Sequence, residues 1–310
     1  MTNIALFTEE NEIKSFISKI SNSNIISIDI EFMRRNTFFP EPCVIQISNG
    51  IIHGCIDLTL KIDYKNIFKE IFSDKKLIVL HSCRQDLEIL YMILGYIPKN
   101  IFDTQFAAAF LGYKYQIGYA ELIKDIYKIT IDKTEKMTNW KKRPLSKEQL
   151  SYAVNDVVYL NKLHEELNNE LLETKKIKYF REEFCNFIND IEWNPDTNDA
   201  WKRIKSIKNL NNNLKNTVKA ISAWREKKAI AKNIPRNWIV SEKELIEISK
   251  NFLIKNKIIF PKNYKSNSIE KDSMEIEKVI SKFYNNSIFD TEKTKEFINN
   301  PEYKKIANEL

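Results

Sequence analysis

Short apolar runs alternate with helical periodicities along the first third of the chain. The apolar runs predict buried strands at 24–32, 43–48, 51–58, 77–80 and 101–104. Apolar positions at helical spacing predict helices at 9–20, 64–72, 84–94 and a further one ending at residue 110. Asn49-Gly50 fits a hairpin turn, so two of the strands are expected to be antiparallel. Strands that alternate with helices predict an α/β domain with helices on both faces of a mixed sheet.

From residue 119 onward the pattern is helical throughout. It predicts helices at 119–127, 146–167, 199–206, 211–231, 242–254, 274–285 and 291–308. The Asn194-Pro195 pair interrupts this pattern and marks the start of a second, all-α domain. Residues 233–240 are expected to form an extended connector that leads to Ser241, which forms a predicted capping box with Glu244.

Composition is that of a folded protein with an ordinary core. Hydrophobic residues make up 43% and charged residues 29% of the 310 positions, which argues against a disordered chain. The first residues lack the pattern of a secretory signal, and no apolar run is long enough for a membrane span. The cysteines show neither a CxxC pair nor zinc spacing. We therefore expect a cytoplasmic protein with reduced thiols, three of them in or near a core: the cysteines are Cys43, Cys55, Cys83 and Cys185.

Charge is distributed unevenly between the two halves. Residues 1–170 carry 21 Lys and Arg against 22 Asp and Glu, whereas residues 171–310 carry 28 against 20. A near-neutral half joined to a basic half predicts chemistry in the first and polyanion binding in the second. The alternative is that the lysine-rich helices simply present a solvated surface.

Two acidic residues interrupt the apolar strand at 24–32. Asp29 and Glu31 are two residues apart, so their side chains point to the same side of the strand. Two carboxylates on one face repel each other and are costly to desolvate, unless a cation lies between them. A divalent metal suits carboxylate oxygens. The alternative is that the strand ends here and both acids face water.

Three later residues are candidate partners for this pair. Asp86 follows the strand at 77–80, at a strand end of the kind where α/β sheets form their sites. The alternative for Asp86 is an acid favoured by a helix N-terminus. Tyr152 and Asp156 are four residues apart and share one face of an otherwise apolar helix, with a half-exposed surface position as the alternative. Four carboxylates can hold two divalent ions for phosphodiester hydrolysis, while Tyr152 orients the attacking water.

Several segments in this order resemble the ribonuclease D family, 3′-to-5′ exoribonucleases of the DEDD superfamily in the subgroup with a tyrosine in its third motif. The segments lie within residues 25–165. They are Asp29-Ile-Glu31-Phe-Met-Arg-Arg, Phe38-Phe-Pro-Glu-Pro-Cys, Val44-Ile-Gln46-Ile, His81-Ser-Cys-Arg-Gln-Asp86-Leu-Glu-Ile, Phe102-Asp-Thr-Gln-Phe-Ala-Ala-Ala, Gly118-Tyr-Ala-Glu-Leu, and Asn139-Trp-Lys-Lys-Arg-Pro-Leu-Ser-Lys-Glu-Gln-Leu-Ser-Tyr152-Ala-Val-Asn-Asp156.

The resemblance implies an RNase H-like α/β exonuclease domain with a mixed sheet of about five strands flanked by helices. It implies that the ligands of two divalent ions, Mg²⁺ or Mn²⁺, are Asp29, Glu31, Asp86 and Asp156. It also implies that Tyr152 positions the water. One position departs from the family pattern, because Asn139 stands where the family usually has Asp. This departure lies outside the metal set and is expected to affect only the loop before the last catalytic helix.

Residues 197–285 resemble an HRDC domain, a small all-α module found in this family and in RecQ helicases. The resemblance rests on Ala200-Trp-Lys-Arg-Ile-Lys, Ala223-Trp-Arg-Glu and Asn233-Ile-Pro-Arg-Asn-Trp-Ile-Val-Ser. Trp201 and Trp224 are expected to be core residues. The implied boundaries are 1–170 for the catalytic domain, 171–196 for a helical linker, 197–285 for the HRDC domain and 286–310 for a helical extension. The candidate RNA-binding residues are Lys202, Arg203, Lys205, Lys227, Lys228, Lys232 and Arg236.

These observations lead us to expect a monomeric, metal-dependent exoribonuclease that acts on RNA 3′ ends and releases nucleoside 5′-monophosphates. Precursor tRNA is the expected substrate, and no membrane partner is expected. A DNA 3′-5′ exonuclease of the same superfamily is one alternative, since nothing in the sequence shows recognition of the 2′-hydroxyl. A catalytically silent RNA-binding protein is the other, and the presence of all four carboxylates and Tyr152 argues against it.

Overall fold

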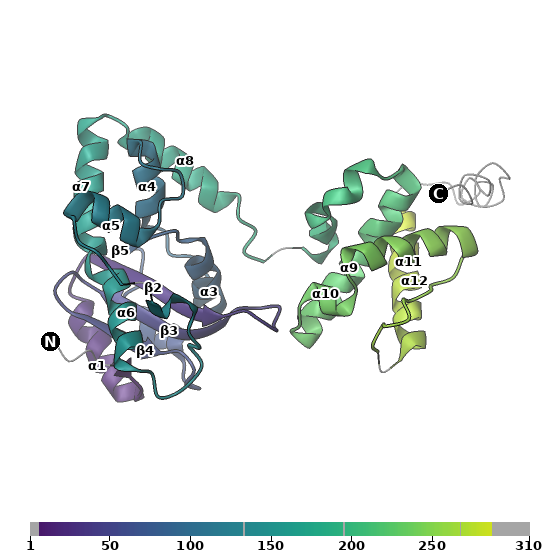
Figure 1. Cartoon of the computed structure of the whole chain (residues 1–310), viewed down its shortest axis with the longest axis horizontal. Coiled ribbons are helices and arrows are strands. Elements are labelled where there is room, and N and C mark those ends of the chain that lie inside the picture. Colours follow the sequence, from purple (N-terminus) through teal and green to yellow (C-terminus); the bar gives the residue numbers. More distant parts are fainter. Residues whose placement is uncertain (1–5, 133, 195, 267, 287–310) are drawn as a thin grey trace. The chain divides into compact units, whose positions relative to one another are not determined.

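The computed structural model describes residues 6–132, 134–194, 196–266 and 268–286. The chain divides into two compact units. The first consists of residues 1–33 and 40–193, and the second of residues 34–39 and 194–310. Figure 1 shows both units and labels most of their helices and strands. The helix predicted at 291–308 lies outside the described residues.

The first unit is built on a mixed sheet with the strand order β1-β4-β3-β2-β5-β6. The strands are β1 (Leu6–Phe7), β2 (Ile25–Met33), β3 (Glu41–Ser48), β4 (His53–Asp57), β5 (Leu77–Leu80) and β6 (Ile101–Asp103). β3 is antiparallel to β2 and β4, whereas β5 is parallel to β2 and β6. The predicted strands are all present, and the mixed sheet is confirmed. The additional strand, β1, is 2 residues long and therefore leaves no periodic signal in the sequence.

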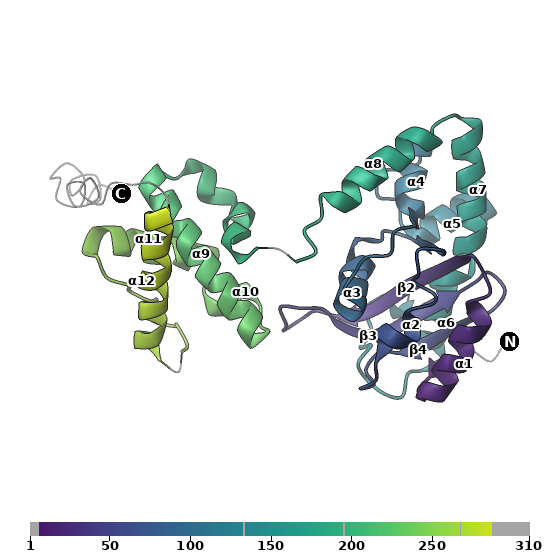
Figure 2. The ribbon, with the colours of Figure 1, turned by 180° about the vertical axis from the view of Figure 1, so that it is seen from behind.

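One face of β2 is apolar and supports the main hydrophobic core. Side chains alternate across a strand, so Ile26, Ile28 and Ile30 lie together on this face, and all three are buried. A slip of one residue would turn them to the opposite face, so their burial fixes the strand's register. The helices on this side, seen in front of the sheet in Figure 2, are α1 (Glu10–Ile20), α2 (Tyr64–Phe68) and α3 (Arg84–Leu94).

The opposite face of β2 carries Ser27, Asp29 and Glu31. Two consecutive helices lie across this face: α6 (Lys147–Val158) contacts β2, β3 and β4, and α7 (Leu160–Glu173) contacts β2 and β5. The Ser27 hydroxyl donates a hydrogen bond of 2.5 Å to the side-chain oxygen of Asn161 on α7. The acids of β2 therefore face a helix layer rather than open solvent.

The pairing of β2 with β3 changes register between Glu31 and Phe32. Before this point the pairing is regular, with Asp29 opposite Gln46 and Glu31 opposite Val44. A bulge disturbs the ladder only locally. Asp29 and Glu31 therefore belong to the regular part of the strand, and the irregularity begins directly after them.

The single helix predicted at 146–167 is in fact the two helices α6 and α7, because the hydrogen-bond ladder is interrupted at Tyr159. The interruption comes from Tyr119, the first residue of α5 (Tyr119–Tyr127). Its hydroxyl accepts a hydrogen bond from the Tyr159 N–H at 3.3 Å and donates one to the Asn155 carbonyl at 3.1 Å. A side chain inserted into the ladder separates two helices in this way, and apolar periodicity alone does not reveal it.

Two more helices of the first unit share an aromatic cluster. They are α4 (Thr104–Leu111) and α8 (Ile177–Asn189), and α8 lies within the segment predicted as a helical linker. Phe180 and Phe184 of α8 are buried in the main core, with ring centroids 6.0 Å and 5.2 Å from that of Phe106 on α4. This packing places α8 in the first compact unit.

The second unit is helical and is organised around α9 (Asn212–Lys232). Val218, Ile221 and Trp224 of α9 are buried in a core of their own, so the prediction for Trp224 is confirmed. The capping box of Ser241 and Glu244 is also confirmed. The other elements are η2 (Thr197–Arg203), η3 (Lys205–Asn209), α10 (Arg236–Ile239), α11 (Glu242–Lys255) and α12 (Ile269–Asn286).

Three predictions for this unit were wrong in detail. Residues 199–206 were expected to form one α-helix, but the chain forms the 3₁₀ helices η2 and η3 there. The connector at 233–240 is not wholly extended, because Pro235 precedes the short helix α10, and proline is well suited to the start of a helix. The helix predicted to begin at 274 begins at Ile269, inside a polar segment with no apolar stripe to signal it.

Residues 34–39 contribute to the core of the second unit through Phe38, which is 7% exposed. The N–H groups of Phe38 and Phe39 both donate to the side-chain oxygen of Asn233, each at 3.1 Å. Asn233 itself adopts the left-handed conformation that ends α9. One side chain therefore serves both as a helix stop and as an acceptor for this loop.

Three of the cysteines are buried, as expected: they are Cys43, Cys55 and Cys83, whereas Cys185 is exposed. Among the described helices, none combines the length and the apolar character that crossing a membrane requires.

Candidate active site

Three of the predicted ligands converge above the polar face of β2. Asp29 and Glu31 project from the strand, and Asp156 projects from α6, which lies across that face. One carboxylate oxygen from each lies within 4.8 Å of the others, and all three side chains are half-buried. This spacing allows the three carboxylates to hold a metal ion between them.

Asp86 lies beside this group, in the first turn of α3, and is 6% exposed. Its carboxylate accepts a hydrogen bond from the backbone of Ile30, the residue between Asp29 and Glu31. The turn that leads into α3 is held by Asp103, whose carboxylate accepts the N–H groups of Ser82 at 3.0 Å and Cys83 at 2.8 Å. Residues from two strands thus fix the position of Asp86.

The carboxylates are held in an environment that is unfavourable to uncompensated negative charge. Burial, followed by the charges of Asp29 and Glu31, raises the pKa of Asp86 well above its ordinary value. Burial also raises the pKa of Asp29 to about 6. A divalent cation would remove this mutual repulsion, so the donor set fits a metal ion.

Tyr152 lies one helical turn before Asp156 on α6 and is half-buried. Burial raises the pKa of its hydroxyl far above the ordinary value, and the charges of Asp156, Glu31 and Asp29 raise it further. Tyr152 and Asp156 are joined by a side-chain hydrogen bond. These effects favour the protonated phenol, which can donate a hydrogen bond.

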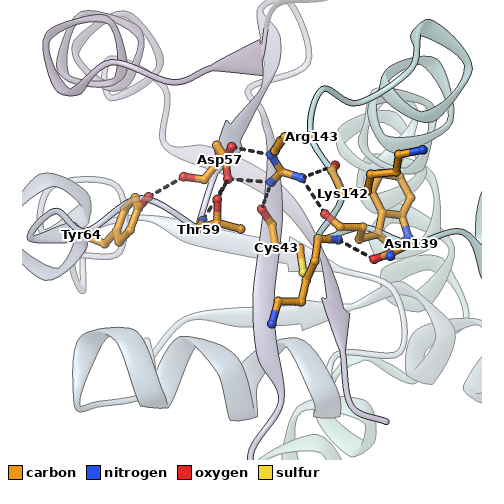
Figure 3. A network of polar contacts seen from close by, with 9 residues as sticks. Cys43, Asp57, Thr59, Tyr64, Asn139, Lys142 and Arg143 are labelled. Atoms are coloured by element: carbon orange, nitrogen blue, oxygen red, sulfur yellow. Dashed lines mark hydrogen bonds and ion pairs between the residues drawn. The ribbon is translucent and has the colours of Figure 1, made fainter. Parts of the chain in front are cut away.

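An ion pair that we did not predict anchors the segment leading into α6 (Figure 3). Arg143 donates from Nε to Oδ2 of Asp57 and from Nη2 to Oδ1, at 2.6 Å each. The same guanidinium donates to the carbonyls of Trp140 at 2.6 Å and Cys43 at 3.0 Å. Ser146, only three residues later, caps α6. The pair thus ties the start of the helix that carries Tyr152 and Asp156 to strands β3 and β4.

Asp57 and Asn139 support the two ends of this network (Figure 3). The Asp57 carboxylate also accepts the backbone N–H of Thr59 at 2.9 Å and its hydroxyl at 2.7 Å, and its carbonyl accepts the Tyr64 hydroxyl. Asn139, the position that departs from the family pattern, accepts the N–H of Lys141 at 3.1 Å. The amide oxygen of Asn139 therefore accepts the same backbone hydrogen bond that an aspartate carboxylate could accept at this position.

Gln46 is a second residue that sequence reasoning missed. It is 0% exposed and lies directly opposite Asp29 in the β2–β3 pairing, on the same face of the sheet. Neither atom of its side-chain amide has a hydrogen-bond partner among the described residues. The signal in the sequence was a lone polar residue within the apolar run of β3, at a position that faces an acid. We add Gln46 to the residues that shape this site.

The predicted RNA-binding cations fall into two groups. Lys228 forms ion pairs with Asp272 and with Glu275, and Arg236 pairs with Glu226, which is 2% exposed. Arg203 also contacts Glu226, and Lys202 pairs with Asp199 at 2.8 Å. The exposed members outside these pairs are Lys205, Lys227 and Lys232. The first group helps to hold the second unit together, and the second is better placed to meet a polyanion.

Known proteins resemble this chain over the first unit and beyond it. A family model described as 3′-5′ exonuclease matches residues 4–172. The ribonuclease D of Bartonella henselae is 34% identical over 245 residues, covering 79% of this chain and 60% of that protein. The ribonuclease D of Granulibacter bethesdensis is 33% identical over 246 residues, covering 79% and 62%. The chain therefore spans less than two thirds of the length of these curated relatives.

Solved structures share the fold. The crystal structure of Escherichia coli RNase D matches with a TM-score of 0.80 at 22% identity, covering 98% of this chain and 81% of that one. The catalytic core of RRP6 from Trypanosoma brucei matches with a TM-score of 0.65 at 18% identity, covering 93% and 82%. These likenesses confirm the predicted α/β exonuclease fold followed by a helical region.

Proposed function

Because this chain belongs to the 3′-5′ exonuclease family, we propose that it is a metal-dependent exoribonuclease that shortens RNA from the 3′ end. The observation that carries the proposal is the convergence of Asp29, Glu31 and Asp156 within 4.8 Å, with Asp86 and Tyr152 beside them. The choice of RNA is supported by the relatives at 33–34% identity, which are ribonucleases D.

Asp29, Glu31, Asp86 and Asp156 would hold two divalent ions, Mg²⁺ or Mn²⁺. Bound ions of this kind lower the pKa of water and neutralise charge on the oxygens of the scissile phosphate. Tyr152, protonated and next to Asp156, orients the attacking water by a hydrogen bond. The Arg143–Asp57 ion pair keeps α6, and with it Tyr152 and Asp156, in place over the sheet. The products are nucleoside 5′-monophosphates.

The helical unit, which we assign as an HRDC domain, would hold the RNA upstream of the 3′ end. Lys205, Lys227 and Lys232 are exposed and can neutralise phosphates, a contact that is independent of sequence and weakens with salt. Within this proposal the substrate is precursor tRNA, and the enzyme acts as a cytoplasmic monomer.

The test is a degradation assay with matched RNA and DNA oligonucleotides labelled at the 5′ end. We expect a ladder of shortened RNA in Mg²⁺ or Mn²⁺ and none in EDTA. Asp29→Asn should reduce the rate by more than the roughly 10- to 100-fold typical of residues that only support a metal ligand. Asp74→Asn is the matched control, since Asp74 is an exposed partner of Lys99.

Two results would replace the proposal. Shortening of DNA but not RNA would identify a DNA exonuclease instead. Tight RNA binding without shortening, in either metal, would identify an RNA-binding protein that has kept the fold.

A further inference from the structure

The second unit contains a pocket of about 430 Å³ that no part of the proposed catalytic site uses. Its wall is formed by the end of α9, by α10, by the first turn of α11 and by the segment that precedes α12. The volume lies in the range of small-ligand sites, which begins at about 300 Å³. The residues that line the pocket include Lys232, Asn237, Trp238, Asn263, Tyr264 and Lys265.

Trp238 is the unusual member of this wall. Its side chain is 58% exposed, whereas Trp224 is 3% exposed and donates its indole N–H to Glu275. Trp201 packs against the core of the unit and lies under the ammonium of Lys219, 4.3 Å from the ring centroid. The core therefore accounts for Trp201 and Trp224. It does not account for Trp238, which presents a large aromatic surface at the pocket.

The groups around Trp238 are those that recognise a nucleotide. Lys232 and Lys265 are exposed in the wall and carry positive charge, and Asn237 offers an amide donor and acceptor. Single-stranded RNA is bound by stacking of bases on aromatic side chains, together with cations that contact the backbone. Stacking on an aromatic ring tolerates every base, which suits an enzyme that must hold many sequences.

The acid in the pocket wall, Glu244, is engaged in the protein itself. Its carboxylate accepts the Ser241 N–H at 2.7 Å, completing the capping box of α11, and it also bonds the side chain of Asn263. Its backbone and side-chain bonds to Ser241 lower its pKa. Glu244 thus helps to shape the pocket wall. The other charged side chains in the wall, Lys232 and Lys265, are exposed and positive.

We propose that this pocket binds one base of single-stranded RNA, stacked on Trp238, with the adjoining phosphates held by Lys232 and Lys265. The inference rests on the proposed function only in its choice of RNA over another polyanion. It adds a stacking site to the diffuse electrostatic grip described above, so binding by the second unit would favour unpaired strands.

The experiment measures binding of a fluorescent single-stranded RNA to the full chain in EDTA, where no hydrolysis is expected. Trp238→Ala should weaken binding by about tenfold, the effect of losing one stacked base. Trp238→Phe should retain most of the affinity, because it keeps an aromatic face. Ile254→Ala is the matched control, since Ile254 is 51% exposed in the same unit. Thermal melts establish that each variant is folded.

The lysines are tested through the salt dependence of the same binding. Removal of two phosphate contacts should make the log–log slope less negative by about 1.4. The double variant Lys232→Ala, Lys265→Ala should show this change, whereas Lys250→Ala with Lys257→Ala, two other exposed lysines of the unit, should not.

Wild-type affinity in Trp238→Ala, or an equal loss in Ile254→Ala, would overturn the pocket assignment. The assignment would also be overturned if a polyglutamate peptide displaced the RNA and its own binding were weakened as much by Trp238→Ala. The site would then not distinguish a base from any other part of a polyanion. Failure of the proposed function is seen separately, as intact RNA after incubation with Mg²⁺ or Mn²⁺.

Discussion

Arg143 and Asp57, 86 residues apart in the chain, form a bidentate ion pair in which both hydrogen bonds measure 2.6 Å. The side chain of Asp57 is 4% exposed and that of Arg143 is 26% exposed. A planar guanidinium suits such a two-point contact, and a lysine cannot reproduce it. The pair joins the edge of the sheet to the segment that leads into α6.

Breaking this pair should destabilise the first unit. Asp57→Asn leaves a largely buried guanidinium without its anion, and we expect a loss of about 3 kcal/mol in the free energy of unfolding. Arg143→Lys should lose a similar amount. Urea unfolding measures both, and the double variant should lose less than the sum of the two. The exposed pair Lys99–Asp74 is the control, with an expected effect below about 1 kcal/mol. Fully additive losses would show that the two residues act independently.

The same pair predicts a dependence of stability on pH. Burial by itself raises the pKa of Asp57, but hydrogen bonds from Arg143 and Thr59 outweigh it, so the net pKa lies below the ordinary value. A carboxyl with a depressed pKa in the folded state contributes stability above its unfolded pKa, about 3.9. That contribution is lost as the pH falls through the folded pKa.

We therefore expect the difference in unfolding free energy between wild type and Asp57→Asn to be constant above about pH 5 and to shrink below about pH 4. Comparing the two proteins at each pH cancels the contribution of the other acids, Asp29 included. A difference that stays constant down to pH 2 would contradict the depressed pKa.

Gln46 should support the metal site rather than the fold. Gln46→Met keeps the size of the side chain and removes two buried polar atoms that lack partners, so stability should be unchanged or higher. The amide, which is free among the described residues, lies opposite Asp29 and is available to hydrogen-bond a ligand or a water of the metal-loaded site, so affinity for Mn²⁺ should fall by about 10- to 100-fold. Calorimetric titration without RNA measures this. Cys55→Ala, which alters the residue on the far side of Gln46, is the control. A loss of stability with unchanged metal affinity would make Gln46 a packing residue only.

Tyr152→Phe should reduce kcat by about 10²-fold and leave the fold intact, since it removes one hydrogen-bond donor from the reaction site. Because Tyr152 is assigned the role of a hydrogen-bond donor and not of a base, wild type and variant should share the same shape of pH–rate profile. Tyr179→Phe, at an exposed position of α8, is the control. If the variant lost one limb of the profile, Tyr152 would be titrating during the reaction, and its assigned role would have to be abandoned.

Adjacent lysines on α9 should behave differently. Lys228→Met leaves Asp272, which is 2% exposed, without its cation, and we expect a loss of about 3 kcal/mol in unfolding free energy. Lys227→Met, at an exposed position, should change stability by less than about 0.5 kcal/mol and should weaken RNA binding at low salt. Thermal unfolding and RNA titration of both variants check this. Equal effects of the two substitutions would remove the distinction between structural and RNA-binding cations.

The arrangement of Asp29 and Glu31, and of Tyr152 and Asp156, could be predicted because both depend on short-range geometry. Alternation along a strand places the first pair on one face, and the helical repeat does the same for the second. The resemblance to a known family supplied the order of the motifs. Ile26, Ile28 and Ile30 are buried on one face of β2. The alternation of side chains therefore places the two acids of β2 on the opposite face of the sheet.

What could not be predicted depends on side chains that are distant in sequence. Nothing local to Tyr119 shows that its hydroxyl enters the ladder of a helix 36 and 40 residues away. Lys228 and Arg236 were predicted to bind RNA from their positive charge alone. The structure shows that they pair with Asp272 and Glu226, respectively, which the sequence does not reveal. The edge strand β1 owes its existence to pairing with β4, and not to a pattern of its own.

The change of register after Glu31 bears on how this family of sequences can vary. Because the regular ladder ends there, an added or deleted residue beyond Phe32 alters the loop that follows and leaves Asp29 and Glu31 pointing as they do. One residue deleted between Ile25 and Asp29 would instead rotate both carboxylates into the isoleucine core. Length variation among relatives should therefore be found on the C-terminal side of this point and be absent from the four strand residues, 25–28, that lead up to Asp29.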